Sequence, residues 1–177
     1  LQVRLVDAFG NNVSTSGTTV TFTAPGSGAS LDAVSQTALT DTSGIASLNA
    51  TANTTAGNFN VTASSVGLTD TSFSLTNTPD VANQFTVAGF ASPVTAGASD
   101  TFTVTALDQF GNTATGYSGT VGFSSSDSHS SVALPGNSTL TNGVGNFNAI
   151  LVTAGSQSIT ATDTVASSII GSQTGIT

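Results

Sequence analysis

Residues 108–112 read Asp-Gln-Phe-Gly-Asn, and residues 7–11 read Asp-Ala-Phe-Gly-Asn. The match extends beyond these turns, because residues 1–22 align with residues 102–123 without a gap. Each copy has an alternating apolar segment, an acidic Gly-Asn turn and a second alternating segment, which is the pattern of two half-buried strands joined by a turn. The chain therefore contains a duplication, and the architecture of one copy predicts that of the other.

The aspartate that opens each turn, Asp7 or Asp108, has two interpretations. A carboxylate at the end of a strand accepts hydrogen bonds from the backbone N–H groups of the turn that follows, and Gly supplies the positive φ that a tight reversal needs. Binding of a metal ion is the alternative, but it requires several converging oxygen ligands. We favour the turn-stabilising role. The phenylalanine of each turn, Phe9 or Phe110, is expected to fold back over one end of a core.

Composition narrows the class of protein. The 177 residues carry a formal net charge of −8, with nine acidic residues, all of them Asp, and Arg4 as the one basic residue. Because almost nothing is available to neutralise phosphates, we expect neither nucleic acid nor an anionic membrane surface as a partner. No run of 18 apolar residues predicts a membrane-spanning helix. The chain has no cysteine, and its abundance of Thr, Ser and Asn favours an extracellular, cell-surface location.

The first copy contains further strand signals after its turn. Alternation over residues 18–23 places Val20 and Phe22 on a core face, and the segment that starts at Gly57 places Phe59 and Val61 inward. The second copy repeats this order, with Gly145, Phe147 and Ala149 in the places of Ala46, Leu48 and Ala50, and with Gln157, Ile159 and Ala161 in the places of Phe59, Val61 and Ala63. Short strands at this spacing, with turn signals between them, predict an all-β chain of two tandem immunoglobulin-like β-sandwich domains.

The boundary between the domains is expected near Pro79, because proline cannot pair in a sheet and forces an extended residue before it. We therefore assign residues 1–78 to the first domain and 79–177 to the second, with a linker at residues 77–83. Residues 84–95 read as a strand broken at Ser92-Pro93, the form expected of a first strand that switches sheets.

The two copies differ at their N-terminal ends. Residues 84–100 supply a strand ahead of Phe102, but nothing in the sequence supplies one ahead of Leu1. We therefore expect the first domain to lack its N-terminal strand, to expose an edge along Leu1–Val6, and to leave the Val20, Phe22, Phe59 and Val61 core partly uncovered. A preceding part of a longer chain or a strand donated by a neighbouring repeat or subunit would fill that place.

The succession of an alternating strand, Asp-x-Phe-Gly-Asn, Thr-Val-x-Phe and Ala-Gly-x-x-x-(Val/Ile)-Thr-Ala resembles the bacterial immunoglobulin-like repeats of invasin-type and giant surface adhesins. The resemblance covers nearly the whole chain and implies an extracellular spacer, stalk or adhesive module without enzymatic activity. Two departures matter. The Cys–Trp–Cys core of antibody-type domains is absent, and no lysine is present for a Lys–Asn isopeptide bond.

Three features suggest chemistry. His129 lies two residues after Asp127 in a serine-rich segment, but a catalytic triad requires groups that converge from rigid positions, so we expect a solvated loop. Tyr117 is expected to cover a domain end. Glycosylation sequons occur at Asn12, Asn49, Asn53, Asn60 and Asn137, and alternation predicts that Asn60 points outward.

The strand order of a seven-stranded sandwich also suggests a metal site. It brings Asp80, Asp108 and Asp163 to one pole, with Asn142 nearby. Carboxylates and backbone carbonyls are the ligands that Ca²⁺ takes in proteins. A low-affinity calcium site at the interdomain joint is therefore one hypothesis, and no other cofactor is expected.

We expect a non-enzymatic structural or adhesive segment of a prokaryotic surface protein. Two alternatives remain. One is the subunit of an extracellular filament that polymerises by donor-strand exchange, and the other is a carbohydrate-binding or accessory module of a surface hydrolase. The exposed tryptophan or tyrosine platforms typical of carbohydrate-binding modules have no counterpart, because the chain has no Trp and one Tyr.

Overall fold

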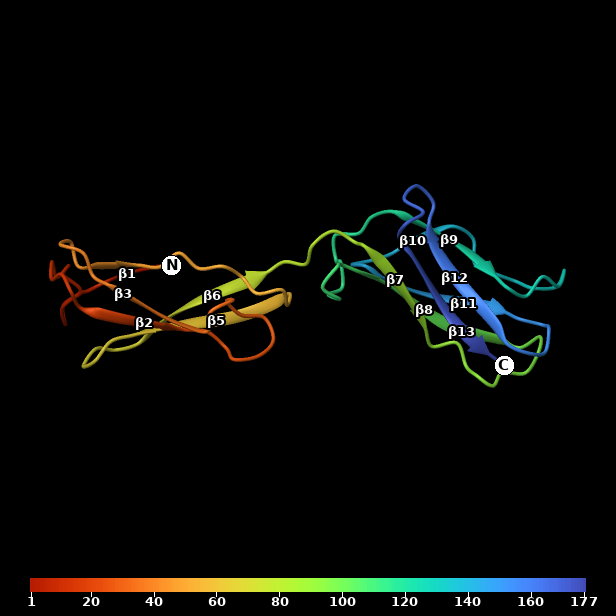
Figure 1. The fold of residues 1–177 in the computed structure, drawn as a ribbon, viewed down its shortest axis with the longest axis horizontal. Helices are drawn as coiled ribbons and strands as arrows, with labels where there is room; N and C mark the ends of the chain where they lie inside the picture. The colour runs from red at the N-terminus through yellow and green to blue at the C-terminus, as the bar shows by residue number, and fades with distance from the viewer. The chain divides into compact units, whose positions relative to one another are not determined.

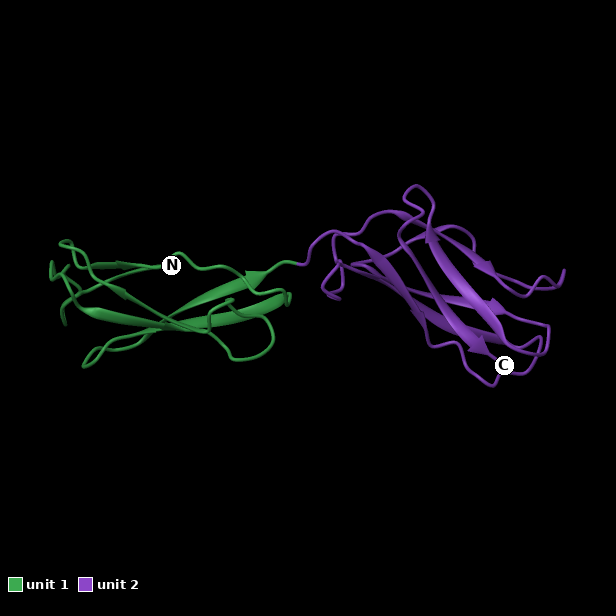
Figure 2. Ribbon diagram, viewed as in Figure 1, with its two compact units in different colours: residues 1–78 green, residues 79–177 purple.

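The computed structural model describes all of residues 1–177, which form strands β1 to β13 joined by turns and loops (Figure 1). The strands group into two compact units, Leu1–Thr78 and Pro79–Thr177, here called unit 1 and unit 2 (Figure 2). No helix is long and apolar enough to cross a bilayer.

Unit 2 is a sandwich of two antiparallel sheets. One sheet has the order β11-β8-β7, formed by Val144–Ile150, Ser99–Leu107 and Gln84–Ala88. The other has the order β10-β9-β12-β13, formed by Ser138–Thr139, Thr120–Ser125, Gln157–Asp163 and Ile170–Ile176. The first two strands and the fifth share one sheet, while the third, fourth, sixth and seventh share the other, which is the strand arrangement of immunoglobulin-like sandwiches.

The core of unit 2 follows from strand alternation. Inward-facing side chains of both sheets are completely buried, among them Phe102, Val104, Val121, Ile159 and Ala161. β7 adds Phe85 and Val87, and Phe90 follows in the segment after the strand.

Unit 1 has the same plan with smaller sheets. β1 (Gln2–Arg4) pairs with β4 (Ile45–Ser47), and a four-stranded sheet has the order β3-β2-β5-β6, formed by Ser35–Leu39, Thr19–Thr23, Gly57–Ser64 and Thr71–Asn77. β1 occupies the place of β8 in the duplicated sequence. β8 pairs with β11 on one side and with β7 on the other, whereas β1 pairs only with β4. The prediction that the first sandwich lacks its N-terminal strand is confirmed.

The predicted consequence for the core of unit 1 is wrong. Val20, Phe22, Phe59 and Val61 are 3%, 1%, 8% and 0% exposed, respectively, because the β1–β4 pair packs over the inner face of the four-stranded sheet. The side chains left half-buried lie instead on the flanking strands, and they are Leu1, Val3, Leu5, Phe73 and Leu75.

The segment after β7 switches sheets, as the sequence predicted. β7 pairs with β8, and beyond it Val94 N donates to Thr177 O at 2.7 Å, so the chain reaches the end of β13 in the opposite sheet. Gly89 lies at the crossover with a φ of 100°, a conformation that favours glycine. This segment therefore closes one side of unit 2 against both sheets.

Candidate functional site

The Asp108 turn is organised by one buried carboxylate. Oδ1 accepts the N–H groups of Phe110 and Asn112, both at 2.9 Å, and Oδ2 accepts Asn112 Nδ2 at 2.9 Å. Oδ2 also accepts the N–H of Asp80 at 3.0 Å. Gly111 has a φ of 84°, as the tight reversal requires. The turn-stabilising interpretation of Asp108 is therefore the one that the geometry supports.

The Asp7 turn has the same local geometry but a different environment. Oδ1 accepts the N–H groups of Phe9 and Asn11 at 2.9 and 2.8 Å, and Oδ2 accepts Asn11 Nδ2 at 3.0 Å. Asp7 is exposed, whereas Asp108 is completely buried. The local motif thus forms in both settings, and the burial of Asp108 is added by the segment that carries Asp80.

Hydrogen bonding lowers the pKa of both carboxyl groups. Burial alone would raise the pKa of Asp108, but the bonds from the Asn112 side chain and from the backbone of Asp80, Asn112 and Phe110 lower it to about 2. The side-chain bond from Asn11 is the main cause of the lowered pKa of Asp7. Both turns therefore hold a negative charge at neutral pH.

The aromatic side chains of these turns lie differently from the prediction. Phe9 is 90% exposed and Phe110 is 53% exposed, so neither folds back to close a core. The reason is that the two backbone N–H bonds to the aspartate fix the turn, and they turn the intervening side chain away from the sheets. The duplicated turn consequently presents a phenyl ring to solvent in both units.

The three residues of the predicted calcium site do not form one cluster. Asp80 approaches Asp108 through its backbone N–H, while its own carboxylate accepts Val81 N at 2.8 Å and Gln109 Nε2 at 3.1 Å. Asp163 accepts the Tyr117 hydroxyl and the N–H groups of Val165 and Ala166. No group of three or more Asp, Glu, His or Cys side chains in the chain is arranged to hold a metal ion. The oxygen atoms are bonded to protein donors instead.

Tyr117 and Asp163 form a partly buried pair that the sequence did not predict. The Tyr117 hydroxyl donates to Asp163 Oδ2, and its ring packs edge-on against Phe85 with centroids 5.4 Å apart. Burial first, and then the neighbouring carboxylate, raises the pKa of Tyr117, while the tyrosine hydroxyl lowers the pKa of Asp163. Tyr117 is thus part of the packing around the unit 2 core.

The segment around His129 has no catalytic geometry. Asp127 Oδ1 accepts the backbone N–H of His129 at 3.1 Å, and His129 Nδ1 accepts the backbone N–H of Ser131 at 3.1 Å. Asp127 is 5% exposed and also binds the backbone of Val152 and the backbone and hydroxyl of Thr153. The expectation of a solvated loop is therefore wrong for Asp127, which anchors the loop to the segment between β11 and β12.

The sequon asparagines differ in accessibility. Asn60 is exposed on β5, as alternation predicted, and its Oδ1 accepts the Ser74 hydroxyl. Asn53 is bound within unit 1, because its side chain contacts the backbone of Ser30 and Gly28 and the side chain of Asn77.

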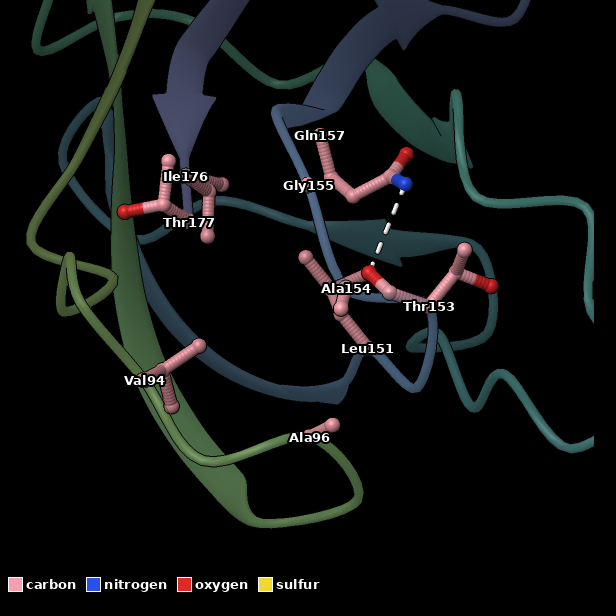
Figure 3. Close-up of a pocket in the computed structure, with 9 residues that line it drawn as sticks. All are labelled: Val94, Ala96, Leu151, Thr153, Ala154, Gly155, Gln157, Ile176 and Thr177. Atoms are coloured by element: carbon pink, nitrogen blue, oxygen red, sulfur yellow. Dashed lines mark hydrogen bonds between the residues drawn. The ribbon is translucent and has the colours of Figure 1, made fainter.

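Two small pockets occupy corresponding places in the two units. The pocket of unit 2 has a volume of about 150 Å³ and is lined by Leu151, Gln157, Ile176 and Thr177 together with Val94 and Ala96 of the switching segment (Figure 3). The pocket of unit 1 has a volume of about 250 Å³ and is lined by Leu1, Leu31, Ala52, Phe59, Leu75 and Asn77, among others. Both are too small for a typical organic ligand.

Comparison with known proteins found no matching family model and no matching curated protein. Solved structures with a similar fold include invasin, described as a bacterial integrin-binding protein, at 22% identity and a TM-score of 0.43, covering 99% of this chain and 35% of that one. The FdeC adhesin of Escherichia coli matches at 21% identity and 0.43, covering 95% and 56%. The chain thus spans about a third of invasin.

A glycosyl hydrolase family 2 member from Bacteroides cellulosilyticus matches at 13% identity with a TM-score of 0.50, covering 91% of this chain and 23% of that one. At this identity the likeness concerns the fold alone. It places the β-sandwich of this chain among folds that occur both in surface proteins and as parts of larger enzymes.

Proposed function

We propose that the chain is a structural segment of a prokaryotic cell-surface protein, in which tandem β-sandwiches act as a stalk or spacer outside the cell. The observation that carries the proposal is the duplication itself. One sandwich plan, with its own core and its own stapled Asp-x-Phe-Gly-Asn turn, is repeated along one chain. Repeating a self-contained domain lengthens a protein without requiring a new fold for each added length.

The outer faces of the sheets suit an environment of variable salt and pH. Neighbouring strands are joined by pairs of neutral side chains, in which hydroxyl groups donate to amide oxygens. In unit 1 the Ser74 hydroxyl donates to Asn60 Oδ1 and the Thr76 hydroxyl to Asn58 Oδ1; in unit 2 those of Thr101 and Thr103 donate to Asn148 and Asn146, at distances of 2.7 to 2.9 Å throughout. Such cross-strand pairs stabilise a sheet without net charge, so salt does not screen them.

Mechanical unfolding tests the stalk role. The chain, held between two handle domains of known behaviour, is pulled in a single-molecule force experiment. We expect two separate unfolding events, with contour-length gains in proportion to residues 1–78 and 79–177 at about 3.6 Å per residue. Smooth extension at low force, without resolved events, would contradict a stalk made of independently folded domains.

The same protein distinguishes a spacer from an adhesive module. Beads coated with residues 1–177 are tested for saturable attachment to a glycan array and to epithelial cells, with beads carrying heat-unfolded protein as the control. A spacer attaches no more than the control does. Saturable attachment that is lost in a Phe9→Ser/Phe110→Ser variant would instead assign adhesion to the exposed turns.

A further inference from the structure

The two units differ in one structural respect, which is the second edge of the strand that precedes the Asp-x-Phe-Gly-Asn turn. In unit 2, Thr103 and Thr105 of β8 pair with Ala88 and Thr86 of β7. Their counterparts in unit 1 are Gln2 and Arg4. Leu5 N donates to Gly44 O on the β4 side, so by alternation along the strand the backbone N–H groups of Gln2 and Arg4 point to the other edge.

Side-chain burial differs at the same positions. The inward residues Phe102, Val104 and Ala106 of β8 are completely buried. Their counterparts Leu1, Val3 and Leu5 are only half-buried. In unit 2 the additional cover comes from Phe85, Val87 and Phe90, which belong to the same core cluster.

The opposite sheet shows the same difference. In unit 2 the switching segment binds the β13 edge: Ser92 Oγ donates to Gly175 O at 3.0 Å, and the backbone of Phe90 exchanges hydrogen bonds with the Gln173 side chain. In unit 1 the corresponding strand is β6, which pairs only with β5. Two neighbouring strand edges, β1 and β6, therefore border one open side of the unit 1 sandwich.

The two pockets identify what fits this side. Phe59 faces Leu75 in the β5–β6 register, and Gln157 faces Ile176 at the equivalent place in β12–β13. Each pair lines the pocket of its unit. In unit 2, Val94 and Ala96 form the remaining wall, as Figure 3 shows, whereas in unit 1 the wall beside Leu75 comes from Leu1 and Leu31.

We propose that the open side of unit 1, between β1 and β6, binds an extended strand donated by a separate molecule, with the chemistry of residues 84–96. The donor is uncharged, and its apolar side chains occupy the places of Phe85, Val87, Phe90, Val94 and Ala96. It has glycine at the crossover, in the place of Gly89. It pairs with the backbone of Gln2 and Arg4, then crosses to the end of β6. Recognition by main-chain pairing plus apolar pockets is β-augmentation.

The unit 2 segment shows that this recognition is complete in itself. Residues 84–96 are held by ladder pairing to β8, by bonds to β13 and by buried side chains. A donor of the same chemistry thus needs no covalent link to the acceptor. The inference does not depend on the stalk role, because strand binding and mechanical unfolding are measured separately.

The test uses a fluorescently labelled synthetic peptide of residues 84–96 and the intact chain. We expect saturable binding by fluorescence anisotropy, and shifts of the Gln2, Val3 and Arg4 amide signals in NMR spectra. A peptide with Phe85→Asp and Val87→Asp should bind at least about tenfold more weakly, because charges replace the buried anchors.

Variants of the protein locate the site. Leu75→Asp should weaken binding by at least about tenfold, because it puts a charge in the unit 1 pocket. Ser72→Asp, which adds the same charge on the exposed face of the same strand, should leave binding unchanged. If Leu75→Asp unfolds unit 1, the amide shifts of the unaltered protein still decide the question.

Three results would overturn the proposal. The first is the absence of binding at millimolar peptide. The second is binding whose amide shifts fall on β8 of unit 2 and not on β1, which would mean displacement of β7. The third is occupation of the groove only when residues 84–96 are fused ahead of Leu1, since the donor would then have to belong to the same molecule.

Discussion

Asp108 accepts the backbone N–H of Asp80 through Oδ2 at 3.0 Å, across 28 residues of sequence. The turn after β8 thereby holds the segment that leads into β7. Asp7 occupies the same place in unit 1 and makes the same bonds within its turn, but it stays exposed. The same motif thus has a purely local role in one unit and a long-range role in the other.

Removal of the two carboxylates should therefore have unequal effects. Asp108→Ala leaves buried N–H groups unpaired, and we expect it to lower the unfolding midpoint of unit 2 by about 5 °C or more. Asp7→Ala should lower the midpoint of unit 1 by less, because water reaches the exposed N–H groups. Tyr117 is the one tyrosine, so its fluorescence reports on unit 2, while calorimetry follows both units. Equal effects would contradict the long-range role of Asp108.

Acid should destabilise unit 2 in a defined range. The folded-state pKa of Asp108 is lowered from its usual 3.8 to about 2, so the unfolded state takes up a proton more readily than the folded state does. The resulting stabilisation is fully present above about pH 4 and is lost as the pH falls toward 2. Asp127 and Asp163 also have lowered pKa values, so Asp108→Asn should reduce this loss without abolishing it. Tyr117 fluorescence during urea titration at each pH measures the effect, and a loss centred between pH 5 and 7 would contradict it.

The Tyr117–Asp163 pair should depend on the absence of a side chain at residue 119. A Cβ built on Gly119 meets Asp163 Oδ2 and the Tyr117 hydroxyl at less than a normal contact distance. We expect Gly119→Ala to reduce the free energy of unfolding of unit 2 by about 1–3 kcal/mol, the usual cost of overpacking. Gly116→Ala in the same loop is the matched control, because its Cβ meets nothing within 4 Å. An equal loss in both variants would point to backbone flexibility and not to the pair.

Limited proteolysis should separate the units before it enters either one. The chain has one basic residue, so proteinase K is a better probe than trypsin. We expect the first cuts within residues 78–83, which lie between the end of β6 and the start of β7. Asp127 binds Val152 and Thr153 and so holds the 124–131 loop, which should therefore be cut later.

An Asp127→Ala variant should bring cleavage of that loop forward, and Ser130→Ala in the same loop should not. Mass spectrometry of the early fragments identifies each site. First cuts within β11 or β12 would contradict the division into two sandwiches.

The duplication made most of the fold predictable, and the limits of prediction are local. Alternation placed Val104 and Ile159 inward, and the Asp-x-Phe-Gly-Asn pattern predicted the stapled turns. The orientation of Phe9 was not predictable in this way, because a turn has no two-residue period. Asp127 was missed because its main partners, Val152 and Thr153, are 25 and 26 residues away and contribute backbone groups that no sequence motif marks.

Amide hydrogen exchange tests most directly whether the two units share one plan and differ in one strand. The N–H groups of Thr103 and Thr105 pair with β7, whereas those of Gln2 and Arg4 face no strand within residues 1–177. In the free monomer at neutral pH, we expect Thr103 and Thr105 to exchange at least about a hundredfold more slowly than Gln2 and Arg4, with Val3 and Leu5 protected by β4. Equal protection of Gln2, Arg4, Thr103 and Thr105 would show that another partner already covers the β1 edge, and would contradict the account.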